Sequence, residues 1–200
     1  MAVEPHVATG HEAATSTGLD NRKVGMWAFL GSECLFFGAM ISTYLLYRNR
    51  TLEGPSLADV YDIPYTSVSA FVLLMSSVTM VLALAAIQRG EHQKLRAWLL
   101  ATALLGLVFV GGQAFEFTEF VQHGFTFRSS VAGSAFFMLT GFHGAHVTVG
   151  VLMLLGLLYL SLLGKLPTQD SLRVELVGLY WHFVDIVWIV IFTIVYLFPQ

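Results

Sequence analysis

The sequence predicts an all-α integral membrane protein, a bundle of five transmembrane helices. Its 200 residues are 56% hydrophobic and only 12% charged, and the mean hydropathy is +0.72, whereas soluble domains carry about a quarter charged residues. The charged residues gather in short clusters between five long apolar runs. Because the connections between the runs are short, we expect one bundle without a second domain.

Each apolar run is long enough to cross a bilayer as a helix. A hydrocarbon core about 30 Å thick requires about 20 residues at 1.5 Å each, whereas a membrane β-barrel would show alternating segments of about ten residues. The helices are expected at residues 24–46, 66–88, 96–117, 131–160 and 174–198. Residues 1–23 lack the apolar stretch of a signal peptide, and we expect them to form a polar, flexible N-terminal tail.

The overall charge and the cysteine content exclude some classes of function and structure. A formal net charge of −3 leaves no basic patch for phosphate, so binding to nucleic acid is not expected. The single cysteine, Cys34, excludes an internal disulfide.

The distribution of basic residues predicts the orientation of the bundle, because short loops rich in Lys and Arg stay on the cytoplasmic side. One side of the predicted bundle carries Arg22, Lys23, Arg89, Lys94, Arg96, Lys165 and Arg173, and the other carries Arg48, Arg50 and Arg128. This asymmetry predicts a cytoplasmic N-terminus. With an odd number of helices, the C-terminus is then expected on the outside.

Glu33 is an acidic residue near the centre of the first predicted helix. Inserting an acidic residue at the centre of a membrane helix costs about 2.5–3.5 kcal/mol on insertion scales, so its presence there indicates a functional role. It points away from a stripe of small residues suited to close helix contact, formed by Gly31, Cys34, Gly38 and Ser42. Its own neighbours on the helical wheel are bulky and apolar, and burial among them favours the neutral acid. Two interpretations follow: proton handling, or a hydrogen-bonded carboxyl that serves packing only.

Two further pairs of polar residues lie at mid-membrane depth. His143 and His146 occupy one face of the fourth helix, and His182 and Asp185 occupy one face of the fifth. Counted at 1.5 Å per residue from opposite ends, both pairs reach the middle of the bilayer. Because hydrocarbon cannot solvate these groups, we expect His143 or His146 to bond to the His182/Asp185 pair.

A metal or haem site is the main alternative to such structural pairing. Histidines with nearby carboxylates can ligate iron or zinc, and two histidines can ligate a haem. No ExxH series repeats across the helices, as a di-iron site would need, and the lack of an internal repeat weakens a transporter interpretation. The favoured interpretation is a structural polar network of Gln113, Glu116, His143, His146, His182 and Asp185.

Four motifs occur in order along the predicted helices. They are GSECLFF at 31–37, GQAFEF at 112–117, GFHGAHVTVG at 141–150 and WHFVDIVW at 181–188. Taken together, they resemble subunit III of haem–copper oxidases, and the resemblance runs from about residue 24 to the end of the chain.

The resemblance implies a non-catalytic accessory subunit of a proton-pumping oxygen reductase in the aerobic respiratory chain. It implies that this chain holds no metal or cofactor, and that haems and copper lie in partner subunits, namely the catalytic subunit I, subunit II and further respiratory-complex subunits. In the family, the glutamate motif matched by Glu33 is associated with proton uptake and with durability during turnover. Cytochrome c oxidase is the favoured complex, and a quinol oxidase is the alternative.

The length of the chain bears on its location and on lipid binding. It lacks the first two helices of the seven-helix form, as shorter bacterial members do, which implies the plasma membrane of a bacterium. Membrane lipid is an expected partner, with bound phospholipid as the ligand. The family's lipid cleft lies between those two helices and the other five, so its lipid contacts do not transfer directly to this chain.

Overall fold

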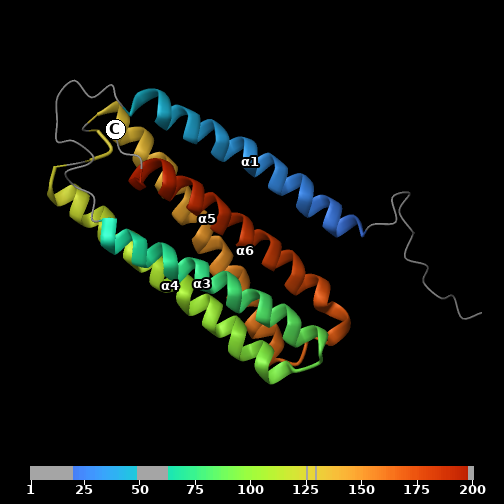
Figure 1. Ribbon diagram of the computed structural model, residues 1–200. Coiled ribbons are helices and arrows are strands. Elements are labelled where there is room, and N and C mark those ends of the chain that lie inside the picture. Colours follow the sequence, from blue (N-terminus) through green and yellow to red (C-terminus); the bar gives the residue numbers. More distant parts are fainter. Residues whose placement is uncertain (1–19, 49–62, 125, 129, 198–200) are drawn as a thin grey trace, which may run out of the picture.

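The computed structural model describes residues 20–48, 63–124, 126–128 and 130–197, so residues 1–19 of the expected tail lie outside the described part. Every regular element in these ranges is helical, and five are long and apolar enough to cross a membrane (Figure 1). They are α1 (Asn21–Tyr47), α3 (Ile63–Gln88), α4 (His92–Gln122), α5 (Val131–Leu162) and α6 (Ser171–Phe192). The 3₁₀ turn η1 (Thr168–Asp170) precedes α6, and the π-helical turn η2 (Thr193–Leu197) follows it. The predicted fold class is confirmed.

The helices extend beyond the apolar runs from which they were predicted. The side chain of Asp20 accepts a hydrogen bond from the backbone of Arg22, so α1 begins at Asn21 rather than at residue 24. Ser130 caps the start of α5 in the same way, because short polar side chains satisfy the free N–H groups of a first turn. Polar residues at both ends of α4 also continue that helix, since hydropathy detects the part inside the bilayer and not the whole helix.

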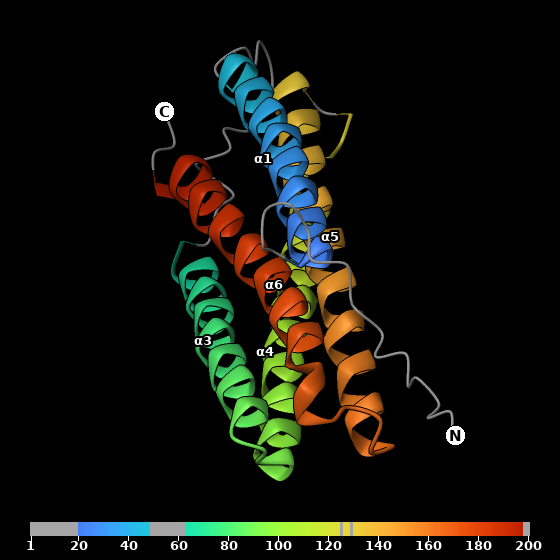
Figure 2. The ribbon, with the colours of Figure 1, turned by 90° about the vertical axis from the view of Figure 1, so that its right-hand side faces the viewer.

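The helices form a bundle in which α1 is the least enclosed member. Helix α4 packs against α3 and α5, and α6 packs against α3, α5 and α1. Helix α1 packs along α5 and α6 and lies apart from α3 and α4, as both views show (Figures 1 and 2). Its buried residues, Leu30, Phe37 and Tyr44, are therefore confined to one stripe with a spacing of seven residues.

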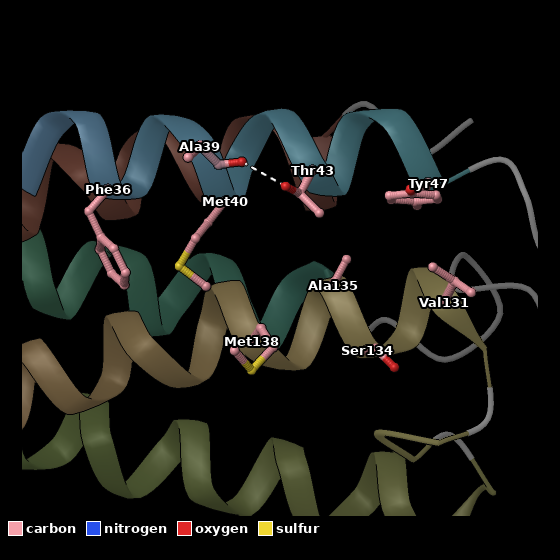
Figure 3. Close-up of a pocket in the computed structure, with 9 residues that line it drawn as sticks. All are labelled: Phe36, Ala39, Met40, Thr43, Tyr47, Val131, Ser134, Ala135 and Met138. Carbon is pink, nitrogen blue, oxygen red and sulfur yellow. Dashed lines mark hydrogen bonds between the residues drawn. The ribbon is translucent and has the colours of Figure 1, made fainter.

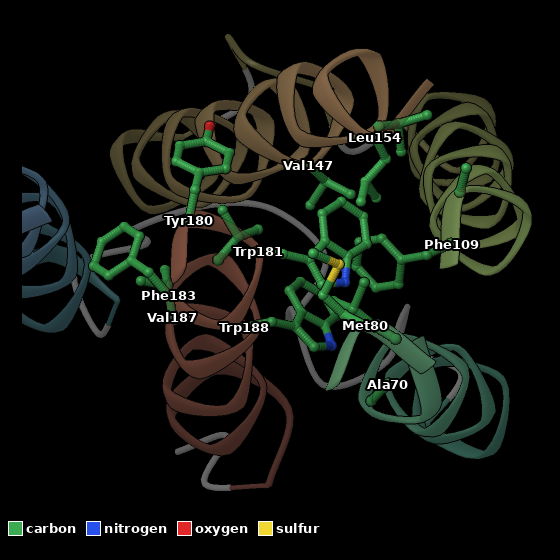
Figure 4. Close-up of a cluster of buried hydrophobic side chains, with 14 of the residues drawn as sticks. Ala70, Met80, Phe109, Val147, Leu154, Tyr180, Trp181, Phe183, Val187 and Trp188 are labelled. Atoms are coloured by element: carbon green, nitrogen blue, oxygen red, sulfur yellow. The ribbon is translucent and has the colours of Figure 1, made fainter. Parts of the chain in front are cut away.

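Trp181 of α6 is the centre of the core, where α4, α5 and α6 meet (Figure 4). Two glycines make room for its ring: a Cβ atom at Gly106 would lie 2.6 Å from Cη2, and one at Gly150 would lie 2.7 Å from Cε3. The indole Nε1 donates a hydrogen bond of 2.9 Å to the hydroxyl of Ser76 on α3. This close packing sets the rotation of α6 about its axis, and so decides where its polar residues point.

Candidate functional site

Glu33 forms a polar bridge between α1 and α5. Its Oε2 lies 3.3 Å from Nε2 of His146, and the two side chains are 18% and 19% exposed. Both residues lie near the middle of their helices. The two groups that the sequence placed at mid-membrane depth on different helices therefore satisfy one another.

The other ring nitrogen of His146 determines how protons are arranged in this pair. Nδ1 lies 2.7 Å from the carbonyl oxygen of Phe142. Because a carbonyl can only accept, Nδ1 must carry a hydrogen. Nε2 then either accepts from a protonated Glu33 or donates to its carboxylate. Either arrangement places one proton between the two groups.

The pair lies in a groove of about 530 Å³ along the seam between α1, α5 and α6, which we call the Glu33 groove. Its lining is mostly apolar and consists of Met26, Phe29, Glu33, Phe142, Ala145, His146, Val149, Met153 and Tyr180. The Tyr180 hydroxyl donates to the backbone oxygen of His146 at 3.1 Å. The groove therefore presents one carboxyl–imidazole pair within apolar walls.

Aromatic rings surround His146 and separate the Glu33 groove from a second one. Phe37 meets the imidazole edge to face, with ring centroids 5.0 Å apart. Phe36 and Phe142 contact each other at 5.4 Å. Phe142 lines the Glu33 groove, and Phe36 lines the second groove, which has a volume of about 420 Å³ and runs along α1 and α5 (Figure 3).

His182 and Asp185 meet a partner that the sequence did not indicate. Ser77 of α3 lies 2.9 Å from Nδ1 of His182 and also donates to Oδ2 of Asp185. The expectation that His143 or His146 bonds to this pair is wrong, because His146 faces α1 and the neighbours of His182 and Asp185 are on α3. Counting residues placed these groups near the middle of their helices, α5 and α6, but it did not identify their neighbours.

His143 is fully buried, and neither ring nitrogen has a hydrogen-bond partner among the described residues. Its ring stacks on Trp188 at a centroid distance of 5.0 Å and meets Phe109 edge to face. Residues three apart on a helix diverge by about 60° around the axis. At this point in the bundle, that angle directs His146 to α1 and His143 into the aromatic core.

Gln113 and Glu116 are both buried, and they link α4 to its neighbours. Nε2 of Gln113 donates to the carbonyl oxygen of Thr140 on α5 at 2.8 Å. Glu116 accepts a hydrogen bond of 2.7 Å from Thr66 of α3 and is bonded to Tyr196 in η2. His182 and Asp185 share Ser77, whereas the other four residues of the predicted network have separate surroundings. The six therefore do not form one connected cluster.

The small-residue stripe on α1 does not mediate a contact within the described part of the chain. A Cβ atom placed at Gly31 or Gly38 would meet nothing within 4 Å, and Cys34 is exposed. The expected close helix contact is therefore absent between the described helices. The bulkier, opposite side of α1 packs into the bundle instead.

Sequence reasoning missed Ser77, Thr66 and Tyr180. Hydroxyls give a weak signal, because a Ser or Thr in a helix can bond to its own backbone, as Ser76 does to the carbonyl of Leu73. The available signal was the position of Ser77 near the middle of its span.

The described residues contain no group of three or more His, Cys, Asp or Glu side chains that could hold a metal ion.

Comparisons with known proteins agree with the resemblance carried by the four motifs. The family model described as cytochrome c oxidase subunit III matches residues 1–200. The chain is 36% identical to cytochrome c oxidase subunit 3 of Bacillus sp. (strain PS3), over 98% of this chain and 95% of that protein. It is 38% identical to the cytochrome bo(3) ubiquinol oxidase subunit 3 of Pseudomonas aeruginosa, over 98% and 94%.

A third relative, the quinol oxidase subunit 3 of Bacillus subtilis, is 37% identical over 87% of this chain and 85% of that protein. These relatives are bacterial, and five helices of this chain can span a membrane. The protein is therefore a multi-pass bacterial membrane protein. It belongs to the cytochrome c oxidase subunit III family, which includes cytochrome c and quinol oxidase forms.

Proposed function

We propose that this chain is a non-catalytic accessory subunit that sustains proton uptake by the catalytic subunit of its oxidase. The observation that carries the proposal is the Glu33–His146 pair, in which a carboxyl oxygen and an imidazole nitrogen lie 3.3 Å apart near the middle of their helices, in an apolar groove. Ionisable groups inside a membrane are costly and mark proton relays and other functional sites.

The pair can exchange protons with little rearrangement. With one proton between Oε2 and Nε2, which lie 3.3 Å apart, the pair has no net charge. Adding a proton gives a neutral carboxyl beside an imidazolium, and removing one gives a carboxylate beside a neutral imidazole. Each change creates one charge within apolar walls, which is costly, so we propose that the pair returns to its neutral arrangement after each exchange.

The proposal places the haems and copper in partner subunits, with subunit I carrying out the chemistry beside subunit II. Purified through a tag on this chain, the complex should contain a much larger haem-bearing subunit. The isolated chain should show no haem spectrum and no stoichiometric iron, copper or zinc. One tightly bound transition metal per isolated chain, or solute uptake by the chain alone in vesicles, would contradict this proposal.

Membrane lipid is the further partner that we propose for the two grooves beside α1. Seven of the nine residues lining the second groove are apolar or aromatic, which suits the acyl chains of a phospholipid (Figure 3). The purified complex should therefore retain phospholipid. The isolated chain should also retain phospholipid, and its complete loss from the isolated chain under the same mild delipidation would argue against lipid held in these grooves.

We propose that the N-terminus lies in the cytoplasm and the C-terminus on the outer side, from the seven basic residues on one side of the bundle against three on the other. A reporter that is active only outside the cytoplasm, fused after Gln200, should be active. The same reporter placed between α3 and α4, after Gly90, should be inactive and serves as the control. The reverse pattern would overturn the orientation.

We propose cytochrome c as the electron donor, with quinol as the alternative. The relatives include both kinds of oxidase at similar identity. The donor would bind other subunits, so the test lies outside this chain: a copper-ligand cluster in the adjacent subunit II supports cytochrome c, and its absence supports quinol.

A further inference from the structure

A second polar cluster lies on the opposite side of α6 from the Glu33 groove. Ser77, His182 and Asp185 meet in the seam between α3 and α6, near the middle of both spans. His182 is half-buried. The proposed function does not use this cluster. Two of its polar atoms have no hydrogen-bond partner among the described residues: Oδ1 of Asp185, which is buried, and Nε2 of His182.

Nε2 of His182 is the one of these two atoms that is not buried. The single hydroxyl proton of Ser77 is donated to Asp185, so the hydrogen between Ser77 and Nδ1 must belong to the imidazole. A neutral ring protonated at Nδ1 presents Nε2 as an acceptor. Within the described part of the chain, Nε2 has no partner. It is therefore open to a donor that the described residues do not supply.

The surface around Nε2 is otherwise apolar and open. His182, Ile186 and Ile189 follow one face of α6 at i, i+4 and i+7, and Ile186 is 60% exposed. On α3, Leu74 and Val81 flank Ser77 on its outward side and are also exposed. We call this surface the α3–α6 face. It has the composition of a lipid-facing surface with one imidazole acceptor at its centre.

Hydrocarbon supplies no hydrogen-bond donor, so an acceptor at this depth stays unsatisfied against lipid. A second copy paired about a two-fold axis at His182 does not satisfy it either, because that axis brings the same patch onto itself and one acceptor nitrogen would face another. A different transmembrane helix that presents a donor at mid-membrane depth does satisfy it.

We propose that the α3–α6 face docks a transmembrane helix of the haem-bearing subunit, and that this helix donates a hydrogen bond to Nε2 of His182. The inference rests on the proposed function, which supplies such a partner. This docking leaves the Glu33 groove and the second groove open on the other side of the bundle. Helix α6 takes part in both sites, because Tyr180 bonds to the backbone of His146 and His182 faces the partner.

The position of the interface can be tested with a photo-crosslinking amino acid in the full complex. At Ile186, on the α3–α6 face, it should crosslink to the haem-bearing subunit. The control is Leu152 on α5, which is 63% exposed against 60% for Ile186 and should crosslink to lipid only. A crosslink from Ile186 to a second copy or to no protein would overturn the inference, as would a haem-subunit crosslink from Leu152 alone.

The role of His182 can be tested by two substitutions and a detergent challenge. His182→Leu should lower the fraction of chain retained on the haem-bearing subunit several-fold, whereas His182→Gln, which keeps an acceptor oxygen, should retain most of it. Equal retention of both variants and the parent would refute the hydrogen bond. If the unmodified chain does not co-purify with a haem-bearing subunit, the proposed function fails; if it does but docks through another face, only this inference fails.

Discussion

Replacing Glu33 with glutamine should leave assembly intact and impair proton supply to the oxidase. The amide keeps the shape of the side chain and can still bond to Nε2 of His146, at present 3.3 Å from Oε2. It cannot release or take up a proton. We expect a clear loss in at least one of three measurements on the assembled complex: protons pumped per electron, turnover at high pH, or endurance during turnover.

The control for Glu33→Gln is Glu119→Gln, which makes the same chemical change on an exposed residue near the end of α4. That variant should match the parent in all three measurements. A Glu33→Gln complex that assembles normally and also matches the parent would show that Glu33 serves packing only, and the proposed role of the pair would then be wrong.

A hydrophobic carbodiimide offers an independent test of the same site, because it attacks a protonated carboxyl. Glu33 should be modified selectively, since it lines an open groove. Glu116 and Asp185 are 6% and 4% exposed and should react slowly. Glu33→Gln should abolish the labelling. Preferential labelling of a different carboxyl would indicate that Glu33 is ionised or inaccessible.

Replacing Asp185 with alanine should lower the stability and the assembly of the chain more than replacing it with asparagine. Alanine leaves the Ser77 hydroxyl without its acceptor in the seam between α3 and α6, whereas asparagine keeps an oxygen there. An unsatisfied buried group costs about 1–3 kcal/mol, although pairs in membranes average about 0.6 kcal/mol. The thermal unfolding midpoint in detergent and the yield of assembled complex measure the effect.

Two comparisons decide whether the effect of Asp185→Ala arises from the bond to Ser77. Ser77→Ala should cause a similar loss, and the double variant should lose less than the sum, because both changes remove the same interaction. Asp170→Ala, at the start of α6, removes a surface carboxylate 3.5 Å from Arg173 and should have little effect. Additive losses, or equal effects of alanine and asparagine, would contradict the pairing.

The spans and the depth of the polar residues were predictable because they depend on the order of residues along one helix. An apolar run of sufficient length forms a transmembrane helix whatever its neighbours are, and the rise per residue places Glu33, His146 and His182 near the centre of their spans. The helix ends were less predictable, since the cap at Asp20 extends α1 beyond its apolar run.

The sequence by itself thus determined the five helices, the position of these polar groups near the middle of their helices and the family, whereas only the tertiary structure decided which polar groups meet. Each pairing depends on which helices are neighbours and on the rotation of each helix about its axis. That rotation follows from side-chain packing, such as that of Trp181 against Gly106 and Gly150. For this reason His146 meets Glu33, and Asp185 meets Ser77 rather than a histidine of α5.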